Sequence, residues 1–510
     1  MKNVNSFFVF LCLFANLFFF SSLSASNNET NNEKVLYRGI FRVNTNISAG
    51  EKSIDEIISK AKDSKIDFIV LSDQFLVKCI YGIFPFRNIF YISKERNSIS
   101  KYGIKNYIDV IEKSSSSCKR PVIIRGVDIA PHYFWELKGG KIFCRQYSQQ
   151  LTIFGEIDEN FLYNLPVIHN SKTNFSIFNN IKRLLPLLLI PFAILLMRKR
   201  IWYEDNQGNK YYKPTKIRRI FAFAIFAISI LWTLNNRPFI DDFPYDQYKD
   251  YGEKPYQELI NYVKNAGKGK IGIAWSAPEA KSINKIADFP SVYLITEKYP
   301  HVLLNTDNYD GFAAIYGDAR TVHLPGKEWD NALLSYCKGK RKKVPFAFGE
   351  LDYHKDLKEI PFDYIKTFIF LDKNKELNKE NIINALLNGN SYASRRGESE
   401  IIMEEFSISN EKEKAYSGEI IELNSENLKL YISGFIEGKI NNLNDKIQCI
   451  VIINGEKKYD KIIESGKNIE ISFCIGKNEF TENLNYLRVI LNSIDSEIIS
   501  NPIFIKKTIK

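Results

Sequence analysis

Two apolar runs near the middle of the chain restrict its fold more than any other feature. They are LLPLLLIPFAILLM at 184–197 and IFAFAIFAISILWTL at 220–234, and both are apolar on every helical face. Each is somewhat shorter than the about 20 residues that span a bilayer, but flanking aromatic and basic residues can extend it. We therefore expect a transmembrane hairpin over residues 182–236. The alternative is a helical hairpin buried in a soluble core.

Charge and the N-terminus predict the same topology for this hairpin. The connector at 198–219 holds eight Lys or Arg against Glu204 and Asp205, so by the positive-inside rule it is cytoplasmic. Residues 1–26 have a basic start, an apolar run and then small residues, as a cleavable export signal has; an uncleaved anchor is the alternative. Both observations place the rest of the chain on the extracytoplasmic side of the cell membrane.

The composition of the 510 residues indicates a folded protein of two or three domains, because 45% are hydrophobic and 25% charged. The net charge of +11 is spread along the chain, which fits an anionic membrane surface or an acidic partner and does not indicate nucleic-acid binding. Seven cysteines show no C-x-x-C and no zinc-like spacing. Cys449 and Cys474 lie in strand-like runs, and either they face each other or they are small buried thiols.

The remaining sequence divides into an α/β part and a β part. Residues 34–170 and 255–400 alternate short apolar strands with helical patterns, for example the capping box SIDE at 53–56. From 405 to 510 the apolar residues alternate with period two between polar turns, which predicts a β-sandwich. Within the first part, His132 is expected at the surface, with a place in a pocket as the alternative. The aromatic stretch 133–135 is expected in the core, with a pocket wall or an interfacial anchor as alternatives.

Four stretches taken together resemble one known family. They are residues 37–74, 306–318, 325–354 and 381–394. Their order is similar to that of the PHP (polymerase and histidinol phosphatase) domain family, and in particular to a membrane-anchored subgroup with a helical hairpin inside the domain and a β-rich tail. The resemblance implies an α/β fold: a distorted (β/α)7 PHP-like barrel, interrupted by the transmembrane hairpin and followed by an all-β sandwich.

The resemblance also implies a position for a metal centre, at the carboxyl ends of the barrel strands. Active PHP enzymes gather His, Asp and Glu ligands there, and two or three metals activate water for phosphoester hydrolysis. In this chain the H-x-H pair corresponds to Arg42 and Asn44, and T-D-H ends in Asp73 and Gln74. The other family positions correspond to Asp128, Gln150, Ala277, Asp352 and His354.

Most ligands are therefore replaced in this chain. The surviving metal-binding candidates are Asp73, Asp128, Asp352 and His354. Arg42 would place a positive charge where a cation must sit, and we expect it to pair with Asp73 or Asp352 instead. The expected pocket residues are Arg42, Asn44, Gln74, Gln150 and Glu350, the last being a second pocket acid or one member of a buried pair.

These substitutions predict a membrane-anchored, extracytoplasmic, cofactor-free module that binds a ligand or protein partner and does not hydrolyse phosphoesters. The alternative is a metal-dependent phosphoesterase with a reduced site that holds Zn, Mn or Fe. A third possibility is a scaffold whose function lies in the β-sandwich. Metal content separates the hydrolase from the other two.

Overall fold

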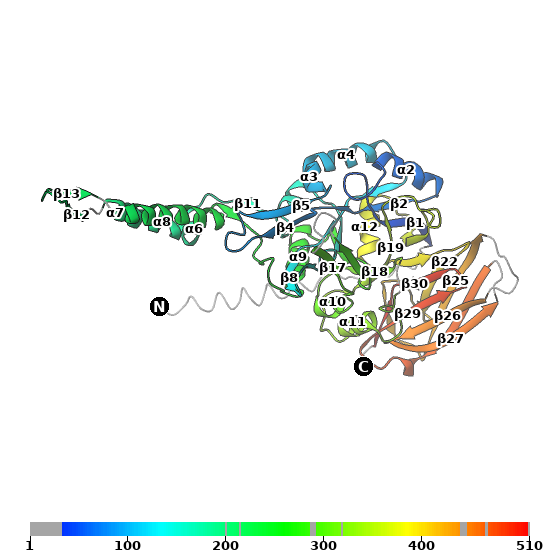
Figure 1. Cartoon of the computed structure of the whole chain (residues 1–510). Coiled ribbons are helices and arrows are strands. Elements are labelled where there is room, and N and C mark those ends of the chain that lie inside the picture. The colour runs from blue at the N-terminus through cyan, green and yellow to red at the C-terminus, as the bar shows by residue number, and fades with distance from the viewer. Residues whose placement is uncertain are drawn as a thin grey trace, which may run out of the picture.

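The computed structural model describes most of the chain and combines helices with parallel and antiparallel strands, so the expected α/β class is confirmed. The described residues are 33–198, 201–213, 216–285, 292–317, 320–438, 446–464 and 468–507. The expected export signal at 1–26 lies outside these ranges. Helices cover the strands of the α/β part, and the C-terminal strands lie to one side of it (Figure 1).

A closed cycle of paired strands forms the centre of the α/β part. Its strands are β1 (Lys34–Val43), β2 (Phe68–Leu71) continued by β3 (Asp73–Gln74), β6 (Val122–Ile124) continued by β7 (Gly126–Ile129), β10 (Leu151–Gly155), β15 (Ile271–Trp275), β18 (Gly311–Ile315) and β19 (Phe346–Tyr353). Neighbours run parallel, except that β10 is antiparallel to β7 and to β15. The strand β19 pairs in parallel with β1 and closes the cycle.

Helices pack around this cycle through their apolar faces. They are α2 (Ile54–Asp63), α3 (Ile99–Tyr102), α4 (Ile104–Ser116), α5 (Glu159–Tyr163), α9 (Lys254–Gly267), α10 (Val302–Asn305), α11 (Glu328–Cys337) and α12 (Lys379–Leu387). The predicted capping box is confirmed at the start of α2, where Ser53 and Glu56 each accept a backbone hydrogen bond from the other. The buried face of α2 carries Ile54, Ile57 and Ile58 at helical spacing.

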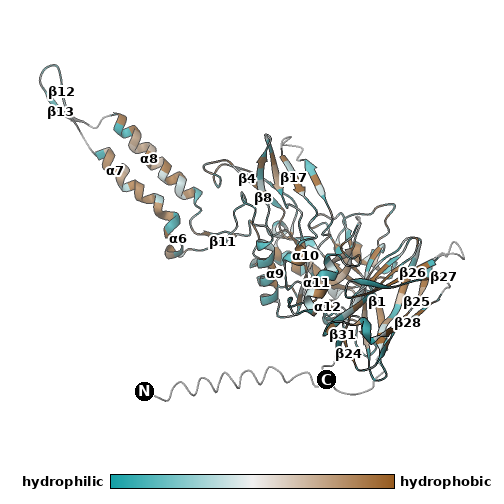
Figure 2. Ribbon diagram, turned by 90° about the horizontal axis from the view of Figure 1, so that it is seen from below, coloured by the Kyte–Doolittle hydropathy of each residue, from teal (hydrophilic) through white to brown (hydrophobic). Residues whose placement is uncertain are grey.

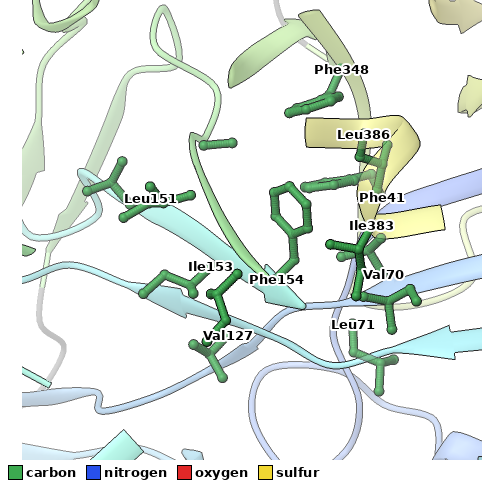
Figure 3. Close-up of a cluster of buried hydrophobic side chains, with 14 of the residues drawn as sticks. Phe41, Val70, Leu71, Val127, Leu151, Ile153, Phe154, Phe348, Ile383 and Leu386 are labelled. Carbon is green, nitrogen blue, oxygen red and sulfur yellow. The ribbon is translucent and has the colours of Figure 1, made fainter. Parts of the chain in front are cut away.

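Three phenylalanines fill the interior of the strand cycle. The ring of Phe41 lies edge-on to Phe154 at 5.1 Å and stacked on Phe348 at 5.2 Å. The side chains converge from three different strands, with Ile383 and Leu386 of α12 beside them (Figure 3). The interior of the cycle is thus a packed core, and a site can form only at its end.

The C-terminal part continues one of the sheets of the α/β part. The strand β1 pairs antiparallel with β20 (Ile365–Asp372), which leads through β21 (Ser391–Arg395) to β30 (Glu497–Ser500). The same sheet contains β24 (Ile420–Leu423), β26 (Lys446–Ile453), β27 (Glu456–Glu464), β29 (Leu484–Asn492) and β31 (Ile503–Lys507). A separate sheet holds β22 (Ser399–Ser409), β23 (Lys414–Tyr416), β25 (Asn427–Gly438) and β28 (Asn468–Gly476). Both sheets contribute to a second hydrophobic cluster, and β25 shows the expected alternation of buried and exposed residues.

Two small β units lie beside the strand cycle. One is the hairpin of β4 (Lys78–Gly82) and β5 (Tyr91–Glu95), and the other is a sheet of β8 (Phe134–Lys138), β9 (Lys141–Arg145), β16 (Ser282–Lys285) and β17 (Val292–Thr296). A third hydrophobic cluster joins them and contains Tyr133 and Trp135, as the core expectation required. His132 is fully buried and packs against Tyr245 and Tyr251, so its expected surface position is wrong.

The two apolar runs form a helical hairpin that projects from the body (Figures 1 and 2). Its first helix, Ile177–Arg198, comprises α6 (Ile177–Leu184), a 3-10 turn (Leu185–Leu188) and α7 (Leu189–Arg198); its second is α8 (Lys216–Asn235). With 22 and 20 residues, the helices are about 33 and 30 Å long, as a bilayer core requires. In the most apolar 18-residue stretch of each helix, only 11% and 17% of the residues are buried. The alternative of a hairpin inside a soluble core is therefore wrong.

The connections of the hairpin are short two-stranded pieces. At the far end lie β12 (Ile201–Glu204) and β13 (Lys210–Lys213), and at the body β11 (Lys172–Thr173) pairs with β14 (Ile240–Asp241). Both ends of the hairpin therefore reach the body at the same place.

The possible pairing of Cys449 with Cys474 is wrong. Cys449 is buried in the core, whereas Cys474 is exposed on the outer face of its strand, and both thiols are free. They lie in different sheets: Cys449 on β26 faces the core, whereas Cys474 on β28 faces away from it.

Candidate functional site

Arg42 lies at a bulge in β1, at the end of the strand cycle. The pairing register of β1 shifts between Phe41 and Val43 with respect to both β2 and β19. Arg42 adopts a left-handed backbone conformation with φ 68°, which is unusual for a residue other than glycine. Such a bulge redirects a side chain, and here it brings the guanidinium group among carboxylates of other strands.

The guanidinium group of Arg42 lies against three acidic side chains. Its Nε donates to Asp128 Oδ2 at 2.8 Å, and its Nη1 lies 3.6 Å from Glu350 and 3.3 Å from Asp352. Its Nη2 donates to Gln150 Oε1 at 2.6 Å. Of the two carboxylates that the sequence offered as partners, Arg42 therefore pairs with Asp352.

Burial and charge determine the ionisation of this cluster. Burial lowers the pKa of Arg42, but Asp128, Asp352 and Glu350 outweigh it and raise the pKa above its ordinary value. Burial raises the pKa of Glu350 to about 8, although Arg42 opposes the shift. Burial acts in the same direction on Asp352, but there Arg42 and His354 dominate and lower the pKa to about 2. At neutral pH the cluster therefore holds a cation, an ionised Asp352 and a Glu350 that is mostly protonated.

Asp352 and His354 form the kept D-x-H pair, and they touch. Asp352 Oδ1 lies 3.1 Å from His354 Nε2, and this contact raises the pKa of His354 against the effect of burial. Asp352 also has a left-handed backbone, with φ 52°. Left-handed conformations thus occur at both Arg42 and Asp352, and strain of this kind concentrates at functional sites.

Asp73 lies outside the contacts of Arg42 and is held by hydroxyl groups. It accepts hydrogen bonds from the backbone and side chain of Thr45, at 2.8 and 2.9 Å, and from Ser48 Oγ at 2.5 Å. Burial raises its pKa to about 6 despite these bonds. Ser48 also contacts Asn44 Oδ1 at 3.3 Å, so Asn44 belongs to the same loop network.

Asp128 is held from a second side by a pair of hydroxyl groups. Thr152 Oγ1 donates to its Oδ1 at 2.5 Å and lies 2.7 Å from Ser276 Oγ. Burial raises the pKa of Asp128, whereas Arg42 and Thr152 lower it by a smaller amount. Ala277, at the position of the family's H-P histidine, follows Ser276 and adds no polar side chain.

A cavity of about 100 Å³ adjoins the Arg42 cluster. Its lining includes three expected site residues, Gln74, Asp128 and Gln150. The other polar lining residues are Lys78, Arg96, Tyr133, Tyr147, Ser148 and Asn284. Because drug-sized ligands occupy pockets of about 300 Å³ or more, this cavity suits a small polar ligand.

Several of these residues were not predicted from the sequence. Thr45 and Ser48 follow β1 in the quoted family stretch, so a search for hydroxyl partners of Asp73 would have found them. Thr152 stands directly opposite Asp128 in the β7–β10 pairing, which the sequence does not reveal. Lys78 and Arg96 carry no motif, and only their position at the cavity identifies them.

The site does not fit the metal centre that the family resemblance implies. Within the described ranges, no group of three or more His, Cys, Asp or Glu side chains is arranged to hold a metal ion. The guanidinium group of Arg42 lies instead between Asp128 and Asp352, the side chains that would share a metal. A permanent cation there opposes a divalent ion electrostatically.

The chain matches no known family profile and no curated protein. Among solved structures it is similar to a two-domain protein from Bacteroides vulgatus ATCC 8482 that contains a predicted PHP-like metal-dependent phosphoesterase, with 10% identity, TM-score 0.35, and 91% of this chain and 96% of that one covered. A candidate metal-dependent phosphoesterase from Bifidobacterium adolescentis ATCC 15703 shows 11% identity and TM-score 0.25, with 68% of this chain and 95% of that one covered. An amidohydrolase from Chromobacterium violaceum, with bound sulfate and no metal, shows 9% identity and TM-score 0.24, with 63% of this chain and 89% of that one covered.

Proposed function

We propose that this protein is a membrane-anchored binding module whose PHP-like barrel has exchanged its metal centre for an arginine. In this proposal the closed strand cycle is a distorted (β/α)7 barrel, the hairpin spans the membrane, and the two C-terminal sheets form a sandwich. The body then lies outside the cytoplasm. The observation that carries the proposal is the buried guanidinium group of Arg42 in contact with Asp128, Glu350 and Asp352.

An arginine at this point removes the means of hydrolysis. A metal activates water by lowering its pKa and by keeping one coordination position open. The guanidinium group remains protonated in proteins, has no open coordination position and engages the carboxylates that would bind a metal. Asp73 and His354 remain as possible ligands, but each is already engaged, by Thr45 and Ser48 or by Asp352.

The adjacent cavity supplies what a binding site needs. Gln74 and Gln150 offer amide donors and acceptors, and Lys78 and Arg96 bring positive charge to the lining. Tyr133 and Tyr147 add ring surfaces with hydroxyl groups. The expected ligand is therefore small and polar, and the hydrogen bond of Gln150 to Arg42 connects the cavity to the charged cluster.

Metal content tests this proposal against a reduced phosphoesterase. The full chain is purified in detergent without chelator, equilibrated with Zn, Mn or Fe, and measured by inductively coupled plasma mass spectrometry beside Asp352→Ala. We expect substoichiometric metal in both proteins. A full equivalent in the native protein that is lost in Asp352→Ala would overturn the proposal and identify a hydrolase that uses Asp73, Asp128, Asp352 and His354.

A gain-of-binding variant sharpens the comparison. Arg42→His combined with Asn44→His and Gln74→His returns imidazoles to the three family positions and removes the competing cation. If Arg42 excludes the metal, this variant binds at least one equivalent while the native protein does not. Equal metal content in the two proteins would contradict a role for Arg42 in exclusion.

A further inference from the structure

The β4–β5 loop, residues 83–90, exposes a cluster of large apolar side chains at one end of the body. Phe84 is 78% exposed, and Ile83 and Phe90 are also exposed. Tyr91 and Ile92, the first residues of β5, continue this surface. Isolated exposed apolar residues are common, but a contiguous group of this kind marks a surface that another phase or molecule covers.

The loop is held against the end of a hairpin helix. The backbone N–H of Asn88 donates to Asn235 Oδ1 at 3.0 Å, and Asn88 Nδ2 donates to the backbone oxygen of Asn235 at 2.7 Å. Asn235 is the last residue of α8, at the end nearest the body. In Figure 1 the β4–β5 hairpin extends from the body toward the projecting helices.

The fold also fixes the orientation of the loop. The guanidinium group of Arg87 stacks on the ring of Tyr248 at 3.7 Å. The hydroxyl of Tyr248 accepts from the backbone N–H of Gly82 at 2.6 Å and donates to the Gly82 carbonyl at 3.1 Å. These contacts hold the loop in place, so its apolar side chains are exposed in a fixed orientation.

Further aromatic residues lie at the same end of the hairpin. Phe175 is 78% exposed and stacks on Phe239, and Phe178 on the first turn of α6 is 86% exposed. Aromatic side chains gather at the level of the lipid headgroups in membrane proteins. The loop and these two residues thus occupy the position at which α6 and α8 would leave the bilayer.

We propose that the β4–β5 loop, with Phe175 and Phe178, inserts into the outer lipid interface and seats the body on the membrane surface. This inference rests on the proposed membrane anchoring by α6–α8. The occupant is a lipid bilayer because the loop is hydrogen-bonded to the end of α8, whose apolar side chains are exposed along the hairpin. The strands β4 and β5 have five residues each, so the cavity at their base, lined by Lys78 and Arg96, lies about 17 Å from the strand ends at which the inserted loop begins.

Depth-dependent quenching tests this contact in the full chain. An environment-sensitive fluorophore is attached at Phe84→Cys, in a background with serine at Cys12, Cys118, Cys337 and Cys474, and the protein is placed in nanodiscs with spin-labelled lipids. A matched label at Phe223→Cys reports the middle of α8. A third label at Ile494→Cys, an exposed apolar residue of the C-terminal part, is the negative control.

We expect blue-shifted emission and strong quenching at positions 84 and 223, and neither at 494. Quenching at 223 without quenching at 84 would overturn the loop contact and leave the membrane anchor intact; a protein partner would then be the occupant of the loop. An absence of quenching at both positions would overturn the anchor and the loop contact together. The double variant Phe84→Ser with Phe90→Ser should increase the hydrogen exchange of β4 and β5 in nanodiscs and leave it unchanged in detergent.

A separate observation concerns two neighbouring thiols, one on β4 and one on β9. Cys79 on β4 and Cys144 on β9 are buried, and their sulfur atoms lie 3.9 Å apart. Both contribute to the third hydrophobic cluster beside Tyr133. The two thiols are thus neighbours, and a disulfide would bring their sulfur atoms to about 2.05 Å.

We infer that Cys79 and Cys144 form a disulfide when the chain folds outside the cytoplasm. Thiol–disulfide exchange with an oxidised dithiol protein of that compartment transfers two electrons: the two cysteine thiols become one disulfide, and the oxidant leaves as two thiols. The bond would tie β4 to the sheet of β9 and so fix Lys78 at the rim of the cavity. This inference rests on the proposed extracytoplasmic location.

Maleimide–polyethylene glycol tagging of the denatured protein counts its free thiols. The thiols of isolated membranes are first trapped with acid, and the protein is then tagged with or without prior reduction. Reduction should add two tags to the native chain and to Cys449→Ser, but none to Cys79→Ser or Cys144→Ser. Labelling of exposed Cys474 by an impermeant reagent in the same cells verifies the location. If Cys474 is labelled from outside and reduction adds no tags, the disulfide is overturned. If Cys474 is not labelled, the extracytoplasmic location and the disulfide are both overturned.

Discussion

Arg42 is the cation of a buried cluster, and its removal leaves carboxylates without their partner. Arg42→Met keeps a long side chain but leaves the buried carboxylate of Asp128 without its cation, which costs about 3–5 kcal/mol. We expect a clear fall in the thermal unfolding midpoint of the full chain in detergent. The control is Arg145→Met, whose partly exposed pair with Glu136 should contribute only about 0–1 kcal/mol. Equal midpoints for the two variants would contradict the charged cluster.

Glu350 makes stability depend on pH with a definite sign. Its folded pKa of about 8 lies above the ordinary value, so the folded state binds the proton more tightly than the unfolded state. Its contribution is complete at acidic pH and is lost as pH rises through about 8. We expect the unfolding midpoint to fall from pH 6.5 to 8.5, and Glu350→Gln to flatten this fall.

The neighbours of Glu350 set the controls for this pH series. The pKa of His354 is also raised, so His354 loses its contribution in the same direction, and His354→Gln isolates its share. Asp352, with a pKa lowered to about 2, finishes titrating below the window, whereas Asp73, with a pKa raised to about 6, still titrates at its lower end and adds to the fall there. A fall of unchanged slope in Glu350→Gln would show that another group carries the pH dependence.

At the residue scale, the sequence predicted one partner of Arg42, Asp352, but offered Asp73 where the structure has Asp128 and Glu350. Arg42, Asp128 and Asp352 could be brought together because the family resemblance places them at strand ends. The hydroxyl groups that fix the carboxylates could not be predicted in the same way. Thr152 holds Asp128 only because β10 pairs with β7 in one register, and a shift by one residue would turn Thr152 to the opposite face.

At the scale of elements, one buried ion pair joins α11 to the C-terminal strand β29. Arg488 makes two hydrogen bonds of 2.8 Å to the carboxylate of Asp330, and both side chains are fully buried. Its guanidinium group also stacks on Trp329 at 4.4 Å. Arg488→Met should destabilise the chain by about 3–5 kcal/mol because Asp330 is left charged and buried.

A double variant tests whether this loss comes from the unpaired charge. Arg488→Met combined with Asp330→Leu removes both charges and should recover much of the thermal midpoint lost in the single variant. If the double variant is as unstable as the sum of the two single variants, the pair acts through packing instead. Circular dichroism should show the loss of β structure together with helix, because α11 and β29 are joined by this contact.

Local patterns identified elements better than they identified connections between them. The capping box of α2 and the buried run of β2 follow from a few neighbouring residues, and both are present. The continuity of β1 through β20 and β21 to β30 depends on pairings between distant segments, which no local pattern encodes; β1 and β20 are more than 300 residues apart. The strands β4 and β5 were missed because they are short and lack a clean period-two alternation: β4 is partly buried, and β5 is exposed throughout.

At the scale of the whole molecule, the hairpin defines two sides. The helices Ile177–Arg198 and α8 run side by side, and the chain leaves and re-enters the body at their near ends (Figures 1 and 2). If they cross a bilayer, the α/β part and the C-terminal sheets must share one side, and the basic connector must occupy the other. The charge of the connector then selects the cytoplasm for the connector.

Cysteine accessibility in intact cells tests this arrangement. A membrane-impermeant maleimide should label the exposed Cys474 without permeabilisation, whereas Gly208→Cys in the connector should react only after permeabilisation. Serine at Cys118 and Cys337 removes the other partly exposed thiols, and Cys474→Ser is the blank. The reverse pattern would place the body in the cytoplasm and remove the basis for an export signal. Labelling of both positions in intact cells would mean that the hairpin does not span the membrane, and the apolar faces of α7 and α8 would then have to be covered by another protein chain.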